Sequence, residues 1–254
     1  MIQSIDRAIT ILNTVAACDS WVGVREVARI VGLKVPTVQN ILKSLASHGY
    51  LEFSEAYRGY RLGVAPLLLA EKTNPVARMA DFARPYLKTL FEQFGETTTC
   101  CTLFGGHVVV VDSILSAEPL TVIHPNRIVE HPHCLASGRL LLAFANEQLI
   151  QNYVKITPFS ELGANLPMTG REFLQELEVI RGQRYAEALN ARSQGVGAVA
   201  VPVFGPGGDV VFALACSAPL ARFDAERRAA VRAVYEACAQ KMGERLGQPA
   251  KGRV

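Results

Sequence analysis

The spacing of apolar residues in the first third of the chain predicts three short helices. The first begins near Ser4, the second runs from about Arg25 to Val31 and stops at Gly32, and the third opens at Pro36. Only four residues separate the second helix from the third, and a short turn containing glycine is typical of a helix-turn-helix. The faces expected to be buried are Ile5, Ile9, Leu12 and Ala16 in the first helix and Val38, Ile41, Leu42 and Leu45 in the third.

A β-hairpin is predicted directly after the third helix. Tyr50–Phe53 and Tyr60–Leu62 have the composition of strands, and the polar, turn-rich segment Ser54–Gly59 lies between them. A helix-turn-helix followed by such a hairpin is a winged helix. In that fold the second helix of the motif enters the major groove of DNA, and the hairpin lies against the backbone or the minor groove.

The net charge of +3 is concentrated in the same region. Nine of the 26 Lys and Arg residues, but only six of the 23 Asp and Glu residues, lie within positions 1–80. The rest of the chain is therefore neutral overall. This division is expected if the first third meets a polyanion and the remainder does not.

Polar residues of the winged helix are the candidates for DNA contact. The amides of Gln39 and Asn40 suit adenine edges, whereas Lys43 and the hairpin arginines suit phosphates, which supply affinity but no sequence choice. The alternative is that the trihelical unit is only a packing module with ordinary surface amides. The candidate DNA-binding residues are Arg25, Lys34, Thr37, Gln39, Asn40, Lys43, Ser44, Arg58 and Arg61.

The remaining two thirds of the chain predict an α+β domain, with helices flanking one mainly antiparallel sheet. A helix over Ala83–Phe94 stops at Gly95, and two strands, Thr97–Phe104 and His107–Ser113, are joined through two glycines. Further helices are expected at 136–145, about 148–154 and 170–181, and strands at 198–204 and 210–217. A terminal helix is expected to bury Val231, Val234, Cys238, Met242 and Leu246.

Motifs along nearly the whole chain resemble the isocitrate-lyase-regulator (IclR) family of bacterial transcription factors. The motifs are Ser4–Ala8, the helix-turn-helix at Arg25–Leu45, Gly49–Leu51 with Tyr60–Gly63, Gly95–Thr97, Leu135–Ala143 and Gly195–Phe204. The resemblance implies a winged helix-turn-helix at 1–63, a linker helix at 64–80 that helps to pair subunits, and a GAF-like sensor domain at 81–254. It also implies an oligomeric regulator, a dimer or a tetramer, expected to act as a repressor on a palindromic operator.

The same resemblance places an effector pocket between the helix that opens near Ala136 and two late strands. A small carboxylate effector, aromatic or aliphatic, would be stabilised there by the N–H groups of the helix terminus. The alternative is that these small residues only let the helix pack tightly on the sheet. The candidate effector-binding residues are Cys134, Ala136, Ser137, Gly138, Ala198, Ala215, Cys216 and Ser217.

Two departures from the family pattern bear on recognition. Asn40 stands where the family's recognition helix usually has an arginine, which should change the bases that are read. Before Gly195, Arg184, Ala188 and Ala191 occupy positions where the family has a glycine, an acidic or Ser residue and a Glu. The loss of the acid favours a more apolar effector than a small hydroxy acid.

A histidine- and cysteine-rich segment offers a rival interpretation. His131, His133 and Cys134 suggest a zinc-binding regulatory or sensor protein, although zinc needs three or four converging ligands and alternate side chains of an extended segment face opposite ways. No Gly-x-Ser-x-Gly or papain-like cysteine context is present, so we expect no enzymatic activity and no cofactor. The short apolar runs and few cysteines predict a cytoplasmic protein with reduced thiols and no membrane partner.

Overall fold

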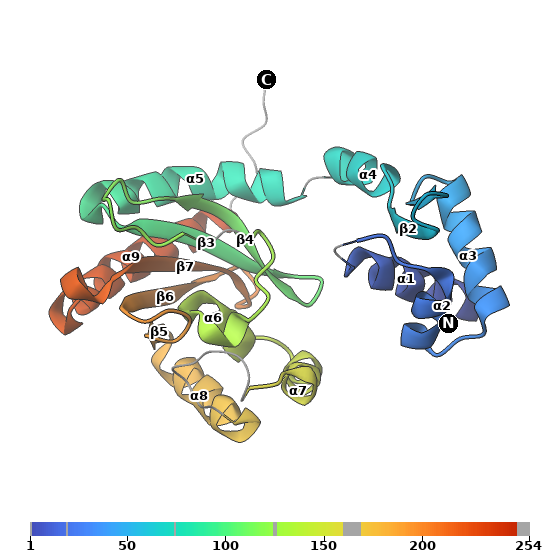
Figure 1. Cartoon of the computed structure of the whole chain (residues 1–254). Coiled ribbons are helices and arrows are strands. Elements are labelled where there is room, and N and C mark those ends of the chain that lie inside the picture. Colours follow the sequence, from blue (N-terminus) through green and yellow to red (C-terminus); the bar gives the residue numbers. More distant parts are fainter. Residues whose placement is uncertain (1, 19, 74, 124–125, 160–168, 248–254) are drawn as a thin grey trace. The chain divides into compact units, whose positions relative to one another are not determined.

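A computed structural model describes residues 2–18, 20–73, 75–123, 126–159 and 169–247, which form two compact units divided after Pro75 (Figure 1). The first unit contains α1 (Gln3–Ala16), α2 (Val24–Val31), α3 (Val35–Ser47), β1 (Leu51–Ser54), β2 (Gly59–Leu62) and α4 (Ala65–Thr73). In the second unit the strands are β3 (Thr97–Phe104), β4 (His107–Ile114), β5 (Ala186–Leu189), β6 (Val196–Phe204) and β7 (Val210–Pro219). Its helices are α5 (Pro75–Phe94), η1 (Pro132–Cys134), α6 (Ala136–Ala143), α7 (Glu147–Ile156), α8 (Gly170–Gln183), η2 (Leu220–Arg222) and α9 (Ala225–Leu246).

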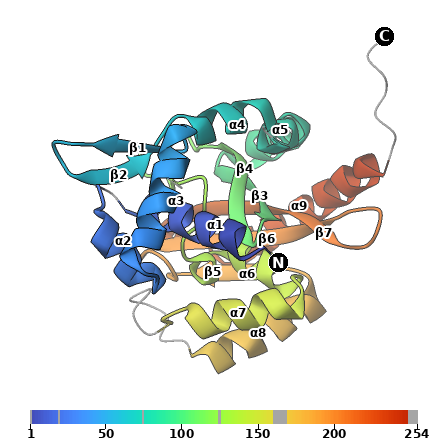
Figure 2. The same ribbon diagram turned by 90° about the vertical axis from the view of Figure 1, so that its right-hand side faces the viewer.

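The first unit is a winged helix, as predicted. Gly32 ends α2 in the left-handed conformation with φ 66°, which glycine adopts without a steric penalty, and Pro36 lies in the first turn of α3. The strands β1 and β2 pair antiparallel and form the wing, which projects beside α3 in Figure 2. A single apolar core joins the helices to the hairpin, and it includes Ile11, Val15, Val22, Val27, Val38, Leu42, Leu51 and Tyr60.

The predicted buried face of the first helix is wrong at Ile5, Ile9 and Ala16, whereas Leu12 packs against the core as predicted. Ile5 and Ile9 are each 52% exposed, whereas Ile11 and Val15 are buried against α2, α3 and β2. Two apolar stripes run along α1, and their spacing is equally helical. Tertiary packing selects one of them and leaves an apolar ridge on the surface of this unit.

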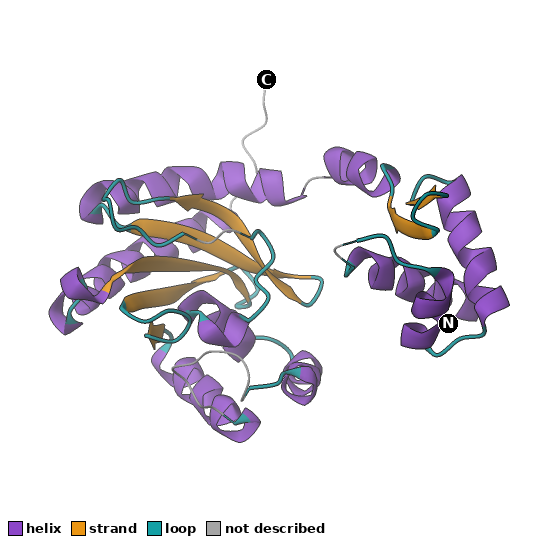
Figure 3. Ribbon diagram, viewed as in Figure 1, coloured by secondary structure: helices purple, strands orange, loops and turns teal. Residues whose placement is uncertain are grey.

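The second unit is an α+β sandwich of helices on both faces of a five-stranded sheet (Figures 1 and 3). The strand order is β4-β3-β7-β6-β5 and every neighbouring pair is antiparallel. Helices α5 and α9 cover one face, with Tyr235, Val199 and Leu214 in the core between them and the sheet. Helix α6, backed by α8, covers the other face around Leu140, Phe173 and other buried residues.

Three local differences from the sequence predictions concern this unit. Helix α5 begins at Pro75 rather than Ala83, and Pro85 lies in its interior. The edge strand β5 was not predicted, because four residues with a buried-intermediate alternation give a weak signal. In α9 the fully buried aromatic residue is Tyr235, whose hydroxyl lies 2.7 Å from the hydroxyl of Thr98 on β3. That hydrogen bond satisfies the polar end of the ring inside the core.

In the described part of the chain, no helix combines the length and the apolarity that crossing a membrane requires.

Candidate nucleic-acid interface and ligand cavity

The outer face of α3 carries most of the predicted DNA-binding side chains. Gln39, Asn40, Lys43 and Ser44 are exposed, while Thr37 is half-buried beside Val38 in the core. Lys34 is exposed at the N-cap of α3, and Arg25 is exposed on α2. The structure therefore brings amide, hydroxyl and ammonium groups to one exposed helix face, and the exposed apolar residues Val35 and Pro36 lie at the start of the helix. This is the composition that base edges and phosphates require.

The two predicted arginines of the wing lie in different surroundings. Arg58 is exposed at the turn in the left-handed conformation, with φ 49°, which is unusual for a residue with a side chain. Arg61 pairs across the hairpin with Glu52, with Nε 2.9 Å from Oε2, and its guanidinium lies 4.4 Å from the centre of the Trp21 ring. Arg61 is thus engaged within the wing, whereas Arg58 is presented to solvent.

Trp21 is a residue that sequence reasoning missed. Its ring stacks on Tyr57 of the wing turn, with centroids 5.5 Å apart and planes 9° from parallel. The next residue, Val22, forms backbone hydrogen bonds of 2.9 Å in both directions with Tyr60 of β2. The segment before α2 therefore fixes the orientation of the wing, a contact between residues too far apart in sequence for any local pattern to reveal.

A small cavity of about 70 Å³ opens at the end of the sheet where β5, β6 and β7 meet the start of α6. Its walls come from the loop after β4, the η1–α6 junction, the β5–β6 turn and the strands themselves. The lining residues are Val122, Ile123, Cys134, Leu135, Ala188, Ala191, Arg192, Ser193, Val196, Ala198 and Ser217. The walls are mainly apolar, with a thiol, two hydroxyls and one guanidinium.

Three of the eight predicted effector-binding residues line this cavity: Cys134, Ala198 and Ser217. Ala136 and Ala215 are buried in the core between α6 and the sheet, and Ser137 is hydrogen bonded to the thiol of Cys101. These three side chains are used in packing helix to sheet.

Gly138 is also used in packing. A Cβ atom built on Gly138 would lie 2.1 Å from the carbonyl oxygen of Pro132, so the backbones of α6 and η1 touch there. The packing interpretation of the small residues at the start of α6 therefore fits their positions better than the pocket interpretation.

Cys216, predicted to bind the effector, lies on the opposite face of the sheet from the cavity. Neighbouring residues of a strand face opposite sides, so Ser217 of β7 faces the cavity while Cys216 faces α9. The Cys216 thiol is buried beside Tyr235, and burial raises its pKa to about 12. An effector in the cavity would not touch it.

Two arginines influence the Cys134 thiol in the cavity wall, one buried and one exposed. Burial raises the pKa of Cys134, while the positive charges of Arg139 and Arg192 lower it. Arg139 is 4% exposed and is neutralised by Glu176, with Nη1 2.6 Å from Oε1, and its Nε donates to the carbonyl of His133 at 2.6 Å. Arg192 is exposed.

The histidine segment is arranged differently from a zinc site. His133 is buried, with Nδ1 2.6 Å from the hydroxyl of Tyr153, and its ring packs against Phe159 and Phe173. The rings of His131 and His133 are 6.2 Å apart. Within the described residues no three His, Cys, Asp or Glu side chains are grouped as metal ligands, and His124 lies outside those residues.

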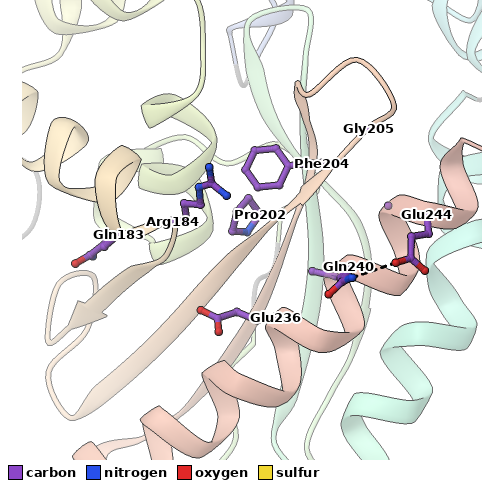
Figure 4. A pocket seen from close by; sticks show the side chains of 10 residues that line it. Gln183, Arg184, Pro202, Phe204, Gly205, Glu236, Gln240 and Glu244 are labelled. Atoms are coloured by element: carbon purple, nitrogen blue, oxygen red, sulfur yellow. Dashed lines mark hydrogen bonds between the residues drawn. The ribbon is translucent and has the colours of Figure 1, made fainter.

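A second and larger cavity, of about 440 Å³, lies between α9, the end of β6 and the C-terminus of α8 (Figure 4). Arg184 lies over the ring of Phe204, 5.6 Å from its centre, and two carboxylates, Glu236 and Glu244, line the α9 side. Gln240 donates to Glu244 at 3.1 Å. With two carboxylates against one guanidinium, this cavity is less suited to an anion than the smaller one.

An exposed polar helix in a helix-turn-helix, a wing beside it and a separate α+β unit with its own cavity define a DNA-binding transcriptional regulator with an effector domain. Two family models match the chain: the IclR helix-turn-helix domain over residues 4–55 and the bacterial transcriptional regulator IclR C-terminal domain over residues 75–244. The protein therefore belongs to the IclR family of transcriptional regulators.

Individual relatives agree over the full length. The HTH-type transcriptional regulator XynR of Escherichia coli strain K12 is 29% identical over 98% of this chain and 99% of its own. An IclR family transcriptional regulator from Brucella abortus has the same fold, with a TM-score of 0.76 at 16% identity over 97% of this chain and 93% of its own. An IclR homologue from Microbacterium hydrocarbonoxydans, solved with 4-hydroxybenzoate, aligns with a TM-score of 0.66 at 19% identity over 96% and 98% of the two chains.

Proposed function

We propose that the protein binds a palindromic operator as an oligomer, places α3 in the major groove, and changes its operator affinity when a small organic acid binds in the second unit. The observation that carries this proposal is the exposed polar face of α3 beside the wing. In this arrangement Gln39 and Asn40 read base edges, Lys43 and Arg58 contact phosphates, and Arg61 stabilises the wing.

Self-association is supported by apolar side chains at the surface of the first unit. Ile5 and Ile9 of α1 are each 52% exposed, and Ile2 at the N-cap of that helix is 67% exposed. On α4 the run Leu67–Leu69 is also exposed, at 50% or more for each residue. Apolar clusters of this kind mark protein–protein interfaces. We therefore propose that residues 64–80 link the two units and help to pair subunits. A two-fold pair would present its recognition helices about 34 Å apart, or a multiple of that distance, along the operator.

Effector control requires that the acid bind one state of the oligomer more tightly than the other. The small cavity between β5, β6, β7 and α6 is the proposed site, and 4-hydroxybenzoate in a protein of the same fold is a precedent for an organic acid. We propose that the protein is a repressor that acts in the cytoplasm, where its operator lies.

A pair of variants tests the division of labour on α3. Lys43→Ala should weaken binding to the operator and to random DNA alike and should reduce the slope of log K against log salt by about one, because one phosphate contact is lost. Asn40→Ala should change the preferred base at one position, by about 1–3 kcal/mol, with little effect on random DNA. Gel shifts on the DNA upstream of the regulated operon measure both.

Lys155→Ala, which removes an exposed lysine from the last turn of α7 in the second unit, is the matched control and should leave DNA binding unchanged. Equal losses on specific and random DNA for both α3 variants would contradict the assignment of Asn40 to base recognition. Wild-type affinity in both variants would show that α3 does not enter the groove.

A further inference from the structure

We propose that Arg192 binds the carboxylate of the effector at the mouth of the small cavity, and that the effector is a short aliphatic acid whose apolar end enters the cavity. This inference rests on the proposed sensing function and reverses the orientation that the sequence suggested, in which the carboxylate lies inward at the start of α6. Five features of the structure support it.

The start of α6 is closed to a ligand. The backbone of Gly138 is in contact with Pro132, whose carbonyl also accepts a hydrogen bond of 3.1 Å from the N–H of Leu135. Ser137 is 6% exposed, and its hydroxyl is hydrogen bonded to the Cys101 thiol. A carboxylate therefore has no space beside the first turn of this helix.

The interior of the cavity offers no cation to an inward-facing carboxylate. Apart from Arg192, the lining consists of apolar side chains with Cys134, Ser193 and Ser217. Arg139 is not among the lining residues: Glu176 pairs with its Nη1, the His133 carbonyl accepts from its Nε, and its Nη2 is buried without a hydrogen-bond partner among the described residues. An anion placed inside would lose its hydration without a partner ion, which is strongly unfavourable.

Arg192 provides the cation that a carboxylate needs, at the mouth of the cavity. Its guanidinium is exposed, it lines the cavity, and its charge is felt at the Cys134 thiol. It forms no ion pair with any residue that the structure describes. A guanidinium in this state can accept a carboxylate in a bidentate arrangement while the anion keeps part of its water.

The turn that carries Arg192 is held in place by its own backbone. The N–H of Asn190 donates to the carbonyl of Val196 at 2.8 Å, and the Asn190 side chain accepts from the N–H of Gly195 at 2.7 Å. Leu220 donates to the Gly195 carbonyl at 2.7 Å. Because the turn is anchored on both sides, its backbone loses little conformational entropy when Arg192 binds a ligand, and the entropy cost is confined to the Arg192 side chain.

The size of the cavity sets the length of the apolar end. A volume of about 70 Å³ holds about five water-sized spheres. Val122, Ile123, Leu135 and Ala198 supply apolar walls for a chain of this length. The inference therefore selects unbranched acids with about four carbons beyond the carboxylate, and we name pentanoate as the probe, with pentanamide as its uncharged counterpart.

The test is calorimetric titration of the full-length protein with pentanoate and with pentanamide. Arg192→Gln should weaken pentanoate binding by about ten- to a hundredfold, as expected for losing hydrogen bonds to a charged group. Arg192→Lys should recover part of this loss, since it keeps the charge but not the bidentate geometry. Pentanamide should bind wild type and both variants equally, and more weakly than pentanoate binds wild type.

Arg171→Gln, which removes an exposed arginine of α8 that does not line the cavity, is the charge-matched control and should behave as wild type. Circular dichroism establishes that each variant is folded. Equal binding of pentanoate to wild type and Arg192→Gln, equal affinity of wild type for acid and amide, or no pentanoate binding at millimolar concentration would each overturn the inference.

Gel shifts without added acid separate this inference from the proposed function. If pentanoate binding depends on Arg192 but the protein binds no operator, the regulatory proposal fails and the inference stands. If the operator is bound but Arg192→Gln takes up pentanoate normally, the inference fails and the regulatory proposal stands.

Discussion

The contact between Gly138 of α6 and Pro132 of η1 predicts a large effect from adding one methyl group. In Gly138→Ala the new Cβ would lie 2.1 Å from the Pro132 oxygen, 2.6 Å from its Cα and 2.7 Å from its carbonyl carbon. All three atoms belong to the backbone, so no side-chain rotation relieves the overlap, and η1 must move away from the helix.

The magnitude follows from two opposing terms. Overpacking of this kind costs about 3 kcal/mol, the upper end of the usual range, because the obstacle is rigid. Alanine restores about 1 kcal/mol, since it favours the helix more than glycine does. We expect a net loss of about 2 kcal/mol in the free energy of unfolding of the second unit.

A matched control has the opposite sign. Gly182, in the last turn of α8, has no atom within 4 Å of a Cβ built on it, so Gly182→Ala should gain about 0.5–1 kcal/mol from helix propensity alone. The same chemical change is thus predicted to destabilise one site and to stabilise another.

Urea unfolding followed by two signals provides the assay. Trp21 is the only tryptophan in the chain, so its fluorescence reports the first unit, whereas far-ultraviolet circular dichroism is dominated by the larger second unit. Gly138→Ala should shift the dichroism transition and leave the fluorescence transition in place. A Gly138→Ala protein as stable as wild type, or stabilised as Gly182→Ala is, would refute the close approach of η1 to α6.

Three further predictions concern other parts of the molecule. Trp21→Leu removes the ring on which Tyr57 and Arg61 stack, which is worth about 1–2 kcal/mol of wing order; gel shifts should show weaker operator binding, and Trp21→Phe should recover part of it. Burial raises the pKa of the Cys101 thiol from its ordinary 9.0 to about 11, so the folded state retains the proton that the unfolded chain releases. The contribution of the buried Cys101 thiol to the free energy of unfolding is therefore complete below pH 9 and is lost as the pH rises towards 11. The expected loss, measured by urea unfolding at a series of pH values, is about 2–3 kcal/mol. A Cys101→Ala protein that loses as much stability over this range would contradict the assignment. Leu68→Asp should lower the sedimentation coefficient of the oligomer, because a carboxylate would replace an apolar side chain that is 52% exposed on α4; an unchanged coefficient would place the subunit interface elsewhere.

Much of the first unit could be predicted from local sequence. Gly32 and Pro36 mark the two ends of the turn between α2 and α3, and they act through backbone preferences that do not depend on the rest of the chain. The hairpin strands and the exposed face of α3 followed from periodicity in the same way. What periodicity did not decide was which of two apolar stripes on α1 is buried, because both have helical spacing and only contact with α3 and β2 distinguishes Ile11 from Ile9.

Local sequence predicted much less of the ligand cavity. Family resemblance pointed to a region in which the structure has a cavity, and the alternation of a strand separates Ser217 from Cys216 once the direction of one of them is known. Arg192 carried no signal, since an arginine in a polar turn before a glycine is typical of solvent-exposed loops. Its role depends on the position of the turn beside Cys134, which is more than fifty residues away in sequence.

The sequence alone therefore determined most of the elements, the class of fold and the family, because these depend on spacing, backbone preference and motifs that are local or repeated along the chain. The tertiary structure decided which face of α1 is buried, which small residues of α6 are packed against Pro132, and which charge stands at the mouth of the cavity. Those outcomes depend on contacts between distant segments, and such contacts are set by how volumes fit together rather than by any single stretch of residues.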